Sequence, residues 1–287
     1  MQIGCHGSVW VPEFDRAGMA TAMAKTRAAG FDLIEIPLMD PDDLDVAATK
    51  AGLAEHELQA TASLGLKPEY DLSSPDADVS AKGEAYLGRA IEVLAEVGGT
   101  HLCGVIACAM AKYPGPPTPE GRANSVAALG RLAEKAQGLG VRLAVEIVNR
   151  YESNLLNTAG QGLAFLDEVG HPNLTVHLDA YHMNIEESDH RTPLVAAGDR
   201  LGYVHAGDSH RGYLGTGTVD FDGFFAGLLE SGFDGPLVFE SFSSAIVHKD
   251  FSTMLAIWRN LWEDSVDLGS EANAFIRHGL RAAGAPA

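Results

Sequence analysis

Leu143-Ala-Val-Glu146 is an apolar run that ends in a potential metal ligand, and the second half of the chain repeats this pattern three more times. The other segments are Thr175-Val-His-Leu-Asp179, Leu201-Gly-Tyr-Val-His205 and Pro236-Leu-Val-Phe-Glu240. Short apolar runs of this kind are typical of strands that are buried on both faces of a sheet. A charge at the end of such a strand is costly to bury unless it is paired or bound to a metal. The four segments therefore predict one shared site.

Strand-like and helix-like segments alternate along the rest of the chain. Eight strands with helical connections in 287 residues predict a (β/α)8 barrel, as a single domain over residues 1–287. A doubly wound open sheet is the alternative, but it would carry a glycine-rich phosphate turn after an early strand, and Gly4-Cys-His-Gly7 lacks the required spacing. The four earlier strands are expected at Gln2–His6, Leu33–Ile36, Leu58–Ser63 and His101–Ile106.

The end of the chain is expected to be helical over about residues 252–283. We predict one helix over Ser252–Leu268 and another over Asn273–Ala283. The first would include the aromatic stretch Trp258–Trp262, most simply as part of the core, with a role in an interface as the alternative.

Composition narrows the classes of partner. The net charge of −19 argues against nucleic acid and anionic membranes, because both require a basic surface. The sequence has no run of 18 apolar residues and no signal peptide pattern at its start, so we expect no membrane span and a cytoplasmic location. Three cysteines fit free thiols in a reducing compartment.

The predicted ligands would lie at the carboxyl ends of strands five to eight, which is the catalytic face of a (β/α)8 barrel. Glu146, Asp179, His205 and Glu240 are mostly hard ligands, and they suit a divalent ion such as Mn²⁺, Mg²⁺ or Co²⁺ better than structural zinc. Each residue also has a simpler interpretation. The glutamates can form salt bridges in loops, Asp179 can cap a helix, and His205 can be a satisfied core histidine.

At these residues the chain resembles the ketose 3-epimerases, a group within the xylose isomerase-like barrels that includes D-tagatose, D-allulose (D-psicose) and L-ribulose 3-epimerases. The resemblance rests on four motifs and extends over nearly the whole chain. They are Val145-Glu-Ile-Val-Asn-Arg-Tyr-Glu152, His177-Leu-Asp-Ala-Tyr-His-Met-Asn-Ile-Glu186, His205-Ala-Gly-Asp-Ser-His-Arg-Gly212 and Phe239-Glu-Ser-Phe242.

The resemblance implies specific roles for these residues. Glu146, Asp179, His205 and Glu240 would hold the metal, with Mn²⁺ as the first expectation, and Glu146 and Glu240 would also be the catalytic pair. Both would act on the C3 proton of a ketose through a metal-stabilised cis-enediolate. Residues that would bind the small-molecule substrate are Glu152, His182 and Arg211 and, lining the pocket, His6, Ser63, Gly65, Ile106 and Phe242. The family also suggests a homotetramer or a dimer.

The chain departs from the family pattern at two positions, with Ala180 where relatives often have Thr and Asp208 where they often have Glu. Three other activities stay open at this point. An aldose–ketose or hydroxypyruvate isomerase uses the same barrel, and a non-catalytic barrel that only binds sugar or stores metal would need no pair of bases. An abasic-site endonuclease would need more histidine ligands, several zinc ions and a basic face.

Overall fold

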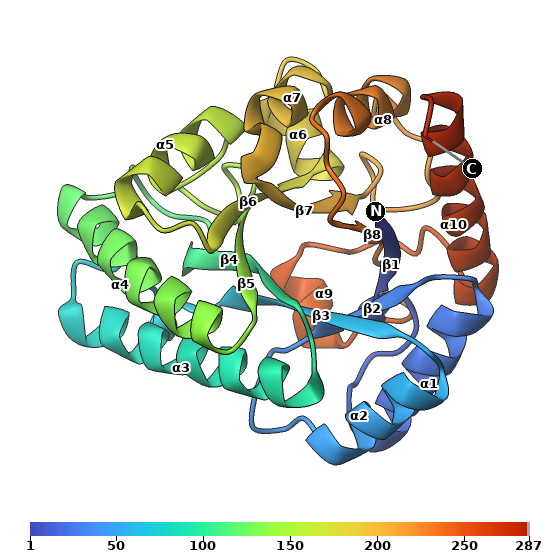
Figure 1. Cartoon of the computed structure of the whole chain (residues 1–287), viewed down its shortest axis with the longest axis horizontal. Helices are drawn as coiled ribbons and strands as arrows, with labels where there is room; N and C mark the ends of the chain where they lie inside the picture. The colour runs from blue at the N-terminus through green and yellow to red at the C-terminus, as the bar shows by residue number, and fades with distance from the viewer. Residues whose placement is uncertain (286–287) are drawn as a thin grey trace.

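The computed structural model describes residues 1–285, and it contains a closed barrel of eight parallel strands in chain order (Figure 1). Strand β1 pairs with β8 as well as with β2, so the sheet has no free edge. This confirms the predicted barrel and excludes the open sheet. The strands are β1 Gln2–His6, β2 Leu33–Pro37, β3 Gln59–Leu66, β4 His101–Ala109, β5 Arg142–Ile147, β6 Leu174–Asp179, β7 Leu201–Ala206 and β8 Pro236–Phe239.

Helices connect the strands and surround the barrel (Figure 1). Polar N-cap side chains begin most of them, and at α5 Thr158 and Gln161 form a reciprocal capping box. The α-helices are α1 Arg16–Ala28, α2 Val46–Glu55, α3 Ala77–Val97, α4 Pro119–Gly138, α5 Ala159–Val169, α6 Ala180–Glu186, α7 Thr192–Ala197, α8 Phe221–Glu230, α9 Lys249–Met254 and α10 Ser265–Ala282. Short 3-10 turns occupy η1 Gly7–Val9, η2 Pro68–Tyr70 and η3 Gly198–Arg200.

The strand register places the four predicted ligands, at the ends of β5 to β8, at about the same height along the barrel. Asp179 pairs directly with His205, and Glu146 pairs with His177, two residues before Asp179. Glu240 follows β8 immediately and donates its backbone N–H to the carbonyl of Ala206. The four predicted ligands therefore lie within one residue of the carboxyl ends of β5 to β8.

The prediction of a helix over Ser252–Leu268 is wrong. Helix α9 ends at Met254, where Ala256 takes a left-handed conformation with φ of 54° and Ile257 returns a backbone hydrogen bond to Ser252. A residue in this conformation ends a helix because it turns the chain out of the helical path.

The following helix is also placed differently from the prediction. Asp264 caps it with hydrogen bonds from the backbone of Val266 and Asp267, so one continuous helix, α10, replaces the expected helix over Asn273–Ala283. The stretch Trp258–Trp262 is not helical, and its two tryptophans have opposite environments, because Trp258 is 79% exposed whereas Trp262 is 4% exposed. Residues 286 and 287, which the single-domain prediction includes, lie outside the described residues.

No helix within residues 1–285 combines the length and hydrophobicity that crossing a membrane requires.

Candidate active site

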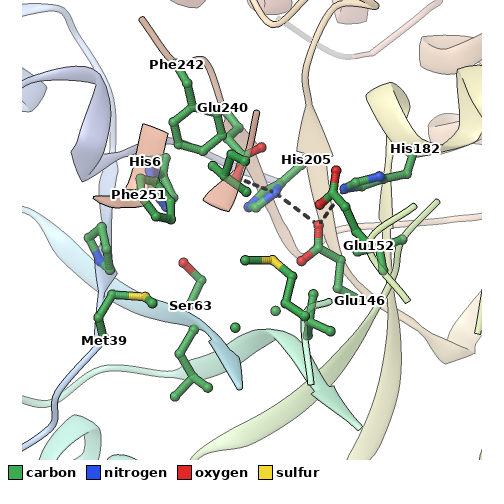
Figure 2. Close-up of a pocket in the computed structure, with 18 of the residues that line it drawn as sticks. His6, Met39, Ser63, Glu146, Glu152, His182, His205, Glu240, Phe242 and Phe251 are labelled. Atoms are coloured by element: carbon green, nitrogen blue, oxygen red, sulfur yellow. Dashed lines mark ion pairs between the residues drawn. The ribbon is translucent and has the colours of Figure 1, made fainter. Parts of the chain in front are cut away.

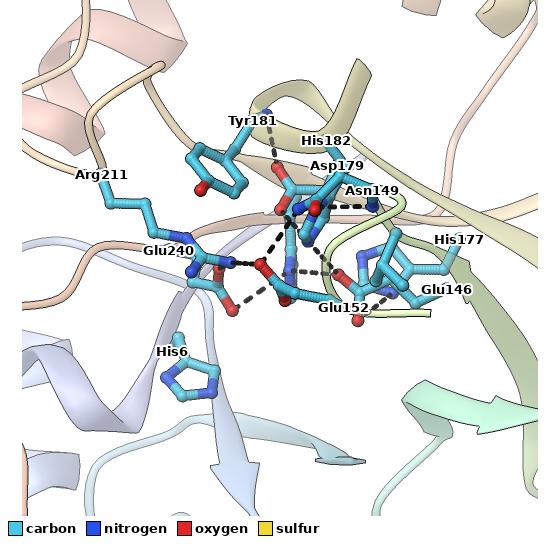
Figure 3. Close-up of polar contacts among 12 residues, drawn as sticks. His6, Glu146, Asn149, Glu152, His177, Asp179, Tyr181, His182, Arg211 and Glu240 are labelled. Carbon is cyan, nitrogen blue, oxygen red and sulfur yellow. Dashed lines mark hydrogen bonds and ion pairs between the residues drawn. The ribbon is translucent and has the colours of Figure 1, made fainter. Parts of the chain in front are cut away.

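The four predicted metal ligands converge at the carboxyl end of the barrel. Figure 3 shows Glu146, Asp179 and Glu240, and Figure 2 shows His205 beside the two glutamates. The Nδ1 atom of His205 lies 3.5 Å from Glu240 Oε1 and 3.9 Å from Glu146 Oε1. Ligand atoms of Asp179, His205 and Glu240 all lie within 4.8 Å of one another. Four side chains from the carboxyl ends of four strands thus face one small volume.

Two atoms in this cluster lack the partners that buried polar groups normally have. Within residues 1–285, Asp179 Oδ2 and His205 Nδ1 are buried and make no hydrogen bond. The other oxygen of Asp179 accepts a hydrogen bond of 2.8 Å from the backbone N–H of Tyr181, so this residue also caps α6. Because an unpaired buried polar group is costly, the two free atoms fit a bound cation.

Burial and the proximity of other charged groups shift the pKa values of Glu146, His205 and Glu240 in this cluster. Burial raises the pKa of Glu240 to about 7 and raises that of Glu146 as well, and in both the proximity of other carboxylates adds to the shift. Burial lowers the pKa of His205, but the neighbouring Glu35 and Glu240 outweigh it, so the net shift is strongly upward. A divalent cation would balance this concentration of negative charge, and the donor set of carboxylates and one imidazole matches the ions that we predict.

The four ligands differ in their access to the cavity. The side chains of Glu146 and Glu240 are 10% and 11% exposed, whereas those of Asp179 and His205 are 0% and 2% exposed. The two glutamates line the cavity, and they reach it from β5 and from the end of β8 (Figure 2). They are therefore the two acidic ligands that a bound molecule can reach.

Arg211 and Glu152 form the polar rim beside the cluster. The Nη2 atom of Arg211 lies 3.9 Å from an oxygen of Glu152 and 3.9 Å from an oxygen of Glu240. Its guanidinium stacks over the ring of Tyr181, 4.0 Å from the centroid (Figure 3). This aromatic contact stabilises the positively charged guanidinium of Arg211 in the buried site.

His182 is fixed with one defined edge toward the cluster. Its Nδ1 accepts a hydrogen bond of 3.1 Å from the backbone N–H of Asn149, so Nε2 carries the proton of the neutral ring. That atom lies 3.6 Å from Glu146 Oε1 and 3.6 Å from Asp179 Oδ2. Burial lowers the pKa of His182, which favours this neutral, donating form.

Most of the other predicted pocket residues line the same cavity. His6, Ser63, Gly65 and Phe242 do so. Ile106 is fully buried and is not among the lining residues, and Gly104 and Val105 line the cavity from β4. The register between β3 and β4 shifts beyond Gly65, which changes the residues of β4 that face inward. Sequence analysis missed most of the apolar wall, which includes Pro37, Met39, Leu64, Met110, Val148, Phe251 and Leu255.

Comparison with known proteins places this site in a family. A family model described as xylose isomerase-like TIM barrel matches residues 23–268. A ketose 3-epimerase from Arthrobacter globiformis is 57% identical over 282 residues, which cover 98% of each chain. The chain belongs to the ketose 3-epimerases. It is accordingly an isomerase that acts on carbohydrates.

Two further relatives extend the comparison to other named activities and to solved structures. An L-ribulose 3-epimerase from Methylomonas sp. is 53% identical over 96% of this chain and 97% of its own. The crystal structure of a D-allulose 3-epimerase from Methylomonas sp. in complex with D-allulose has a TM-score of 0.95 at 53% identity, and the match covers 97% of this chain and 96% of that one.

The two departures from the epimerase pattern have clear places in the structure. Ala180 is fully buried as the first residue of α6, directly after Asp179. Asp208 is also fully buried, and its carboxylate accepts hydrogen bonds from the backbone of Ser209, Thr216 and Gly217. Asp208 therefore stabilises the loop after β7.

Proposed function

We propose that this ketose 3-epimerase inverts the configuration at C3 of free ketoses, with Glu146 and Glu240 as the two acid–base groups. The observation that carries the proposal is their arrangement. Both carboxylates lie within 4 Å of one imidazole nitrogen, they come from the ends of different strands, and both reach the cavity. Inversion by proton transfer needs a base on one side of the carbon and an acid on the other, and this pair supplies both.

The reaction begins with loss of the C3 proton, which is acidic because C3 is next to the carbonyl of a 2-ketose. One glutamate takes the proton, and the other returns a proton to the opposite face. Burial and neighbouring carboxylates raise the pKa of both groups, so each binds a proton more readily than an ordinary glutamate does, which supports their roles in proton transfer.

Glu146, Asp179, His205 and Glu240 would hold a divalent ion, with Mn²⁺ preferred and Mg²⁺ or Co²⁺ as alternatives. When bound, such an ion supplies Lewis acidity that stabilises negative charge on neighbouring sugar oxygens. The two unpartnered atoms of Asp179 and His205 support this assignment.

The substrate end that carries O1 to O3 would be held by Arg211, His182 and Glu152. The fixed Nε2–H of His182 and the stacked guanidinium of Arg211 are donors that need little reorganisation when an oxyanion forms. His6, Ser63, Gly65 and Phe242 would line the rest of the pocket.

Suitable substrate pairs are D-fructose and D-allulose, D-tagatose and D-sorbose, and L-ribulose and L-xylulose. The names of the relatives support the L-ribulose pair, and the D-allulose complex supports the D-allulose pair. A cytoplasmic location and assembly as a homotetramer or dimer stay predictions.

Product analysis tests the proposal. The metal-loaded protein should convert D-fructose into D-allulose. Formation of glucose or mannose would instead indicate 1,2-isomerisation, and sugar binding in calorimetry without turnover would indicate a binding protein.

A further inference from the structure

Glu35 is a carboxylate inside the barrel that the proposed mechanism does not use. It lies in the middle of β2, and its exposed fraction is 0%. A carboxylate in this position is costly to bury unless its contacts compensate for the loss of water. Its contacts therefore indicate why an acidic residue occupies this strand.

The main contact joins Glu35 to a predicted metal ligand. Glu35 Oε2 accepts a hydrogen bond of 2.6 Å from the hydroxyl of Tyr203 and lies 2.8 Å from Nε2 of His205. Because the pKa of Glu35 is lowered, its carboxylate is ionised and can only accept hydrogen bonds, so the imidazole donates and Nε2 carries the proton. The Nδ1 atom lies on the opposite side of the ring and faces Glu240 and Glu146 (Figure 2).

The second oxygen of Glu35 faces another ring of the pocket. His6 Nδ1 accepts a hydrogen bond of 3.2 Å from the backbone N–H of Ser8, so the proton of the neutral ring is on Nε2. That Nε2 atom lies 3.6 Å from Glu35 Oε1. One carboxylate thus faces the N–H edges of two histidines, one at the predicted metal site and one in the pocket wall.

We propose that Glu35 is a positioning residue, which holds His205 by its Nε2–H so that Nδ1 is directed toward Glu146, Asp179 and Glu240. The inference rests on the proposed function, because it takes this cluster to bind a divalent cation. Histidines that bind metals commonly donate their other N–H to a carboxylate, which fixes the ring and its tautomer, and losing that partner weakens metal binding by about 10- to 100-fold.

A purely structural role for Glu35 makes a different prediction. In that case its removal would lower the thermal stability of the protein without changing its affinity for metal. Thr61 provides a matched control. Its hydroxyl lies 2.7 Å from the hydroxyl of Tyr203, so it is linked to Glu35 only through Tyr203 and makes no contact with His205 in this chain of hydrogen bonds. Thr61→Val removes a fully buried hydroxyl from the same interior layer and leaves Glu35 in place.

The test measures Mn²⁺ binding by isothermal titration calorimetry on the full-length protein after chelation. Glu35→Gln should weaken binding by about 10- to 100-fold, whereas Thr61→Val should stay within about twofold of the wild type. Pulsed electron paramagnetic resonance of bound Mn²⁺ should detect nitrogen coupling from the imidazole in the wild type and a weaker coupling in Glu35→Gln. If Glu35→Gln does not fold, Tyr203→Phe, which removes one hydrogen bond from Glu35, should weaken binding about fivefold.

The contradicting results separate the two proposals. The role of Glu35 would be overturned if Glu35→Gln kept the wild-type affinity for Mn²⁺ and the wild-type nitrogen coupling. If Glu35→Gln does not fold, wild-type affinity in Tyr203→Phe would overturn it. Either result would leave the proposed function intact. A wild-type protein that binds none of Mn²⁺, Mg²⁺ and Co²⁺ would overturn the metal site itself, and the role of Glu35 with it.

Discussion

The indole N–H of Trp262 donates a hydrogen bond of 2.8 Å to the hydroxyl of Ser241, which in turn donates one of 2.6 Å to the backbone carbonyl of Arg211. Arg211 has a φ of 58°, a left-handed conformation that residues other than glycine rarely adopt. The segment between α9 and α10 thereby stabilises the backbone of a residue that we propose binds substrate.

Removing this link should weaken substrate binding. Ser241→Ala removes the partner of the Trp262 indole and leaves the Arg211 carbonyl with only the longer hydrogen bond, of 3.3 Å, from the backbone N–H of Phe242. We therefore expect KM for the ketose to rise about five- to tenfold with a smaller change in kcat. Steady-state kinetics with saturating Mn²⁺ would measure both constants.

Ser243→Ala is the matched control, because Ser243 is also fully buried in the loop after β8 and bonds to the backbone carbonyl of Trp262 rather than to Arg211. An equal rise of KM in both variants would show that general loosening of the loop, and not the contact with Arg211, is responsible.

The two proposed acid–base residues should each be indispensable. Glu146→Gln and Glu240→Gln should each lower kcat by about 10²- to 10⁴-fold, because a neutral amide cannot exchange the C3 proton. Circular dichroism should be unchanged. Glu168→Gln, which alters a surface ion pair with Arg122, is the control and should keep wild-type turnover. Near-normal kcat in either active-site variant would remove that residue from the mechanism.

Metal affinity should increase with pH. Burial raises the pKa of Glu240 to about 7 and raises that of Glu146, so both carboxyls bind protons more readily than usual in the metal-free protein. A cation needs the ionised forms, and protons compete with it as the pH falls. Between about pH 8 and pH 6, the Kd for Mn²⁺ should rise about tenfold or more. An affinity that is independent of pH over this range would contradict these shifted pKa values.

Removal of the metal should abolish activity reversibly. Dialysis against a chelator should eliminate turnover, and Mn²⁺ or Co²⁺ should restore it. Bound metal should also stabilise the fold by about 2.7 kcal/mol at a free concentration of 100 times Kd, which a thermal unfolding scan would detect. Sodium chloride at equal ionic strength is the control. Full activity in the chelated protein would exclude a required ion.

Sequence reasoning predicted the barrel and the common location of the four candidate ligands because both depend on local patterns. The ends of the apolar runs at Glu146, Asp179, His205 and Glu240 fall within one residue of the observed strand ends. Asp179 shows that two interpretations can hold together, since one oxygen caps α6 and the other faces the cluster.

What the sequence could not predict depends on long-range geometry. Glu35 interrupts the apolar run Leu33-Ile-Glu-Ile36, which was a usable signal, but its partner His205 is 170 positions away. The resemblance implied that Ile106 lines the cavity, and the register shift between β3 and β4, which leaves no mark in the sequence, places Gly104 and Val105 there. The apparent helix around Trp258 ends early because of the left-handed residue Ala256.

The central claim is that two opposed carboxyl groups exchange the proton on C3 of a ketose. Turnover of D-fructose in heavy water, with the position of the label read by NMR, tests it most directly. The account predicts that the D-allulose formed carries deuterium at C3. Product that contains no solvent deuterium at C3 would contradict it.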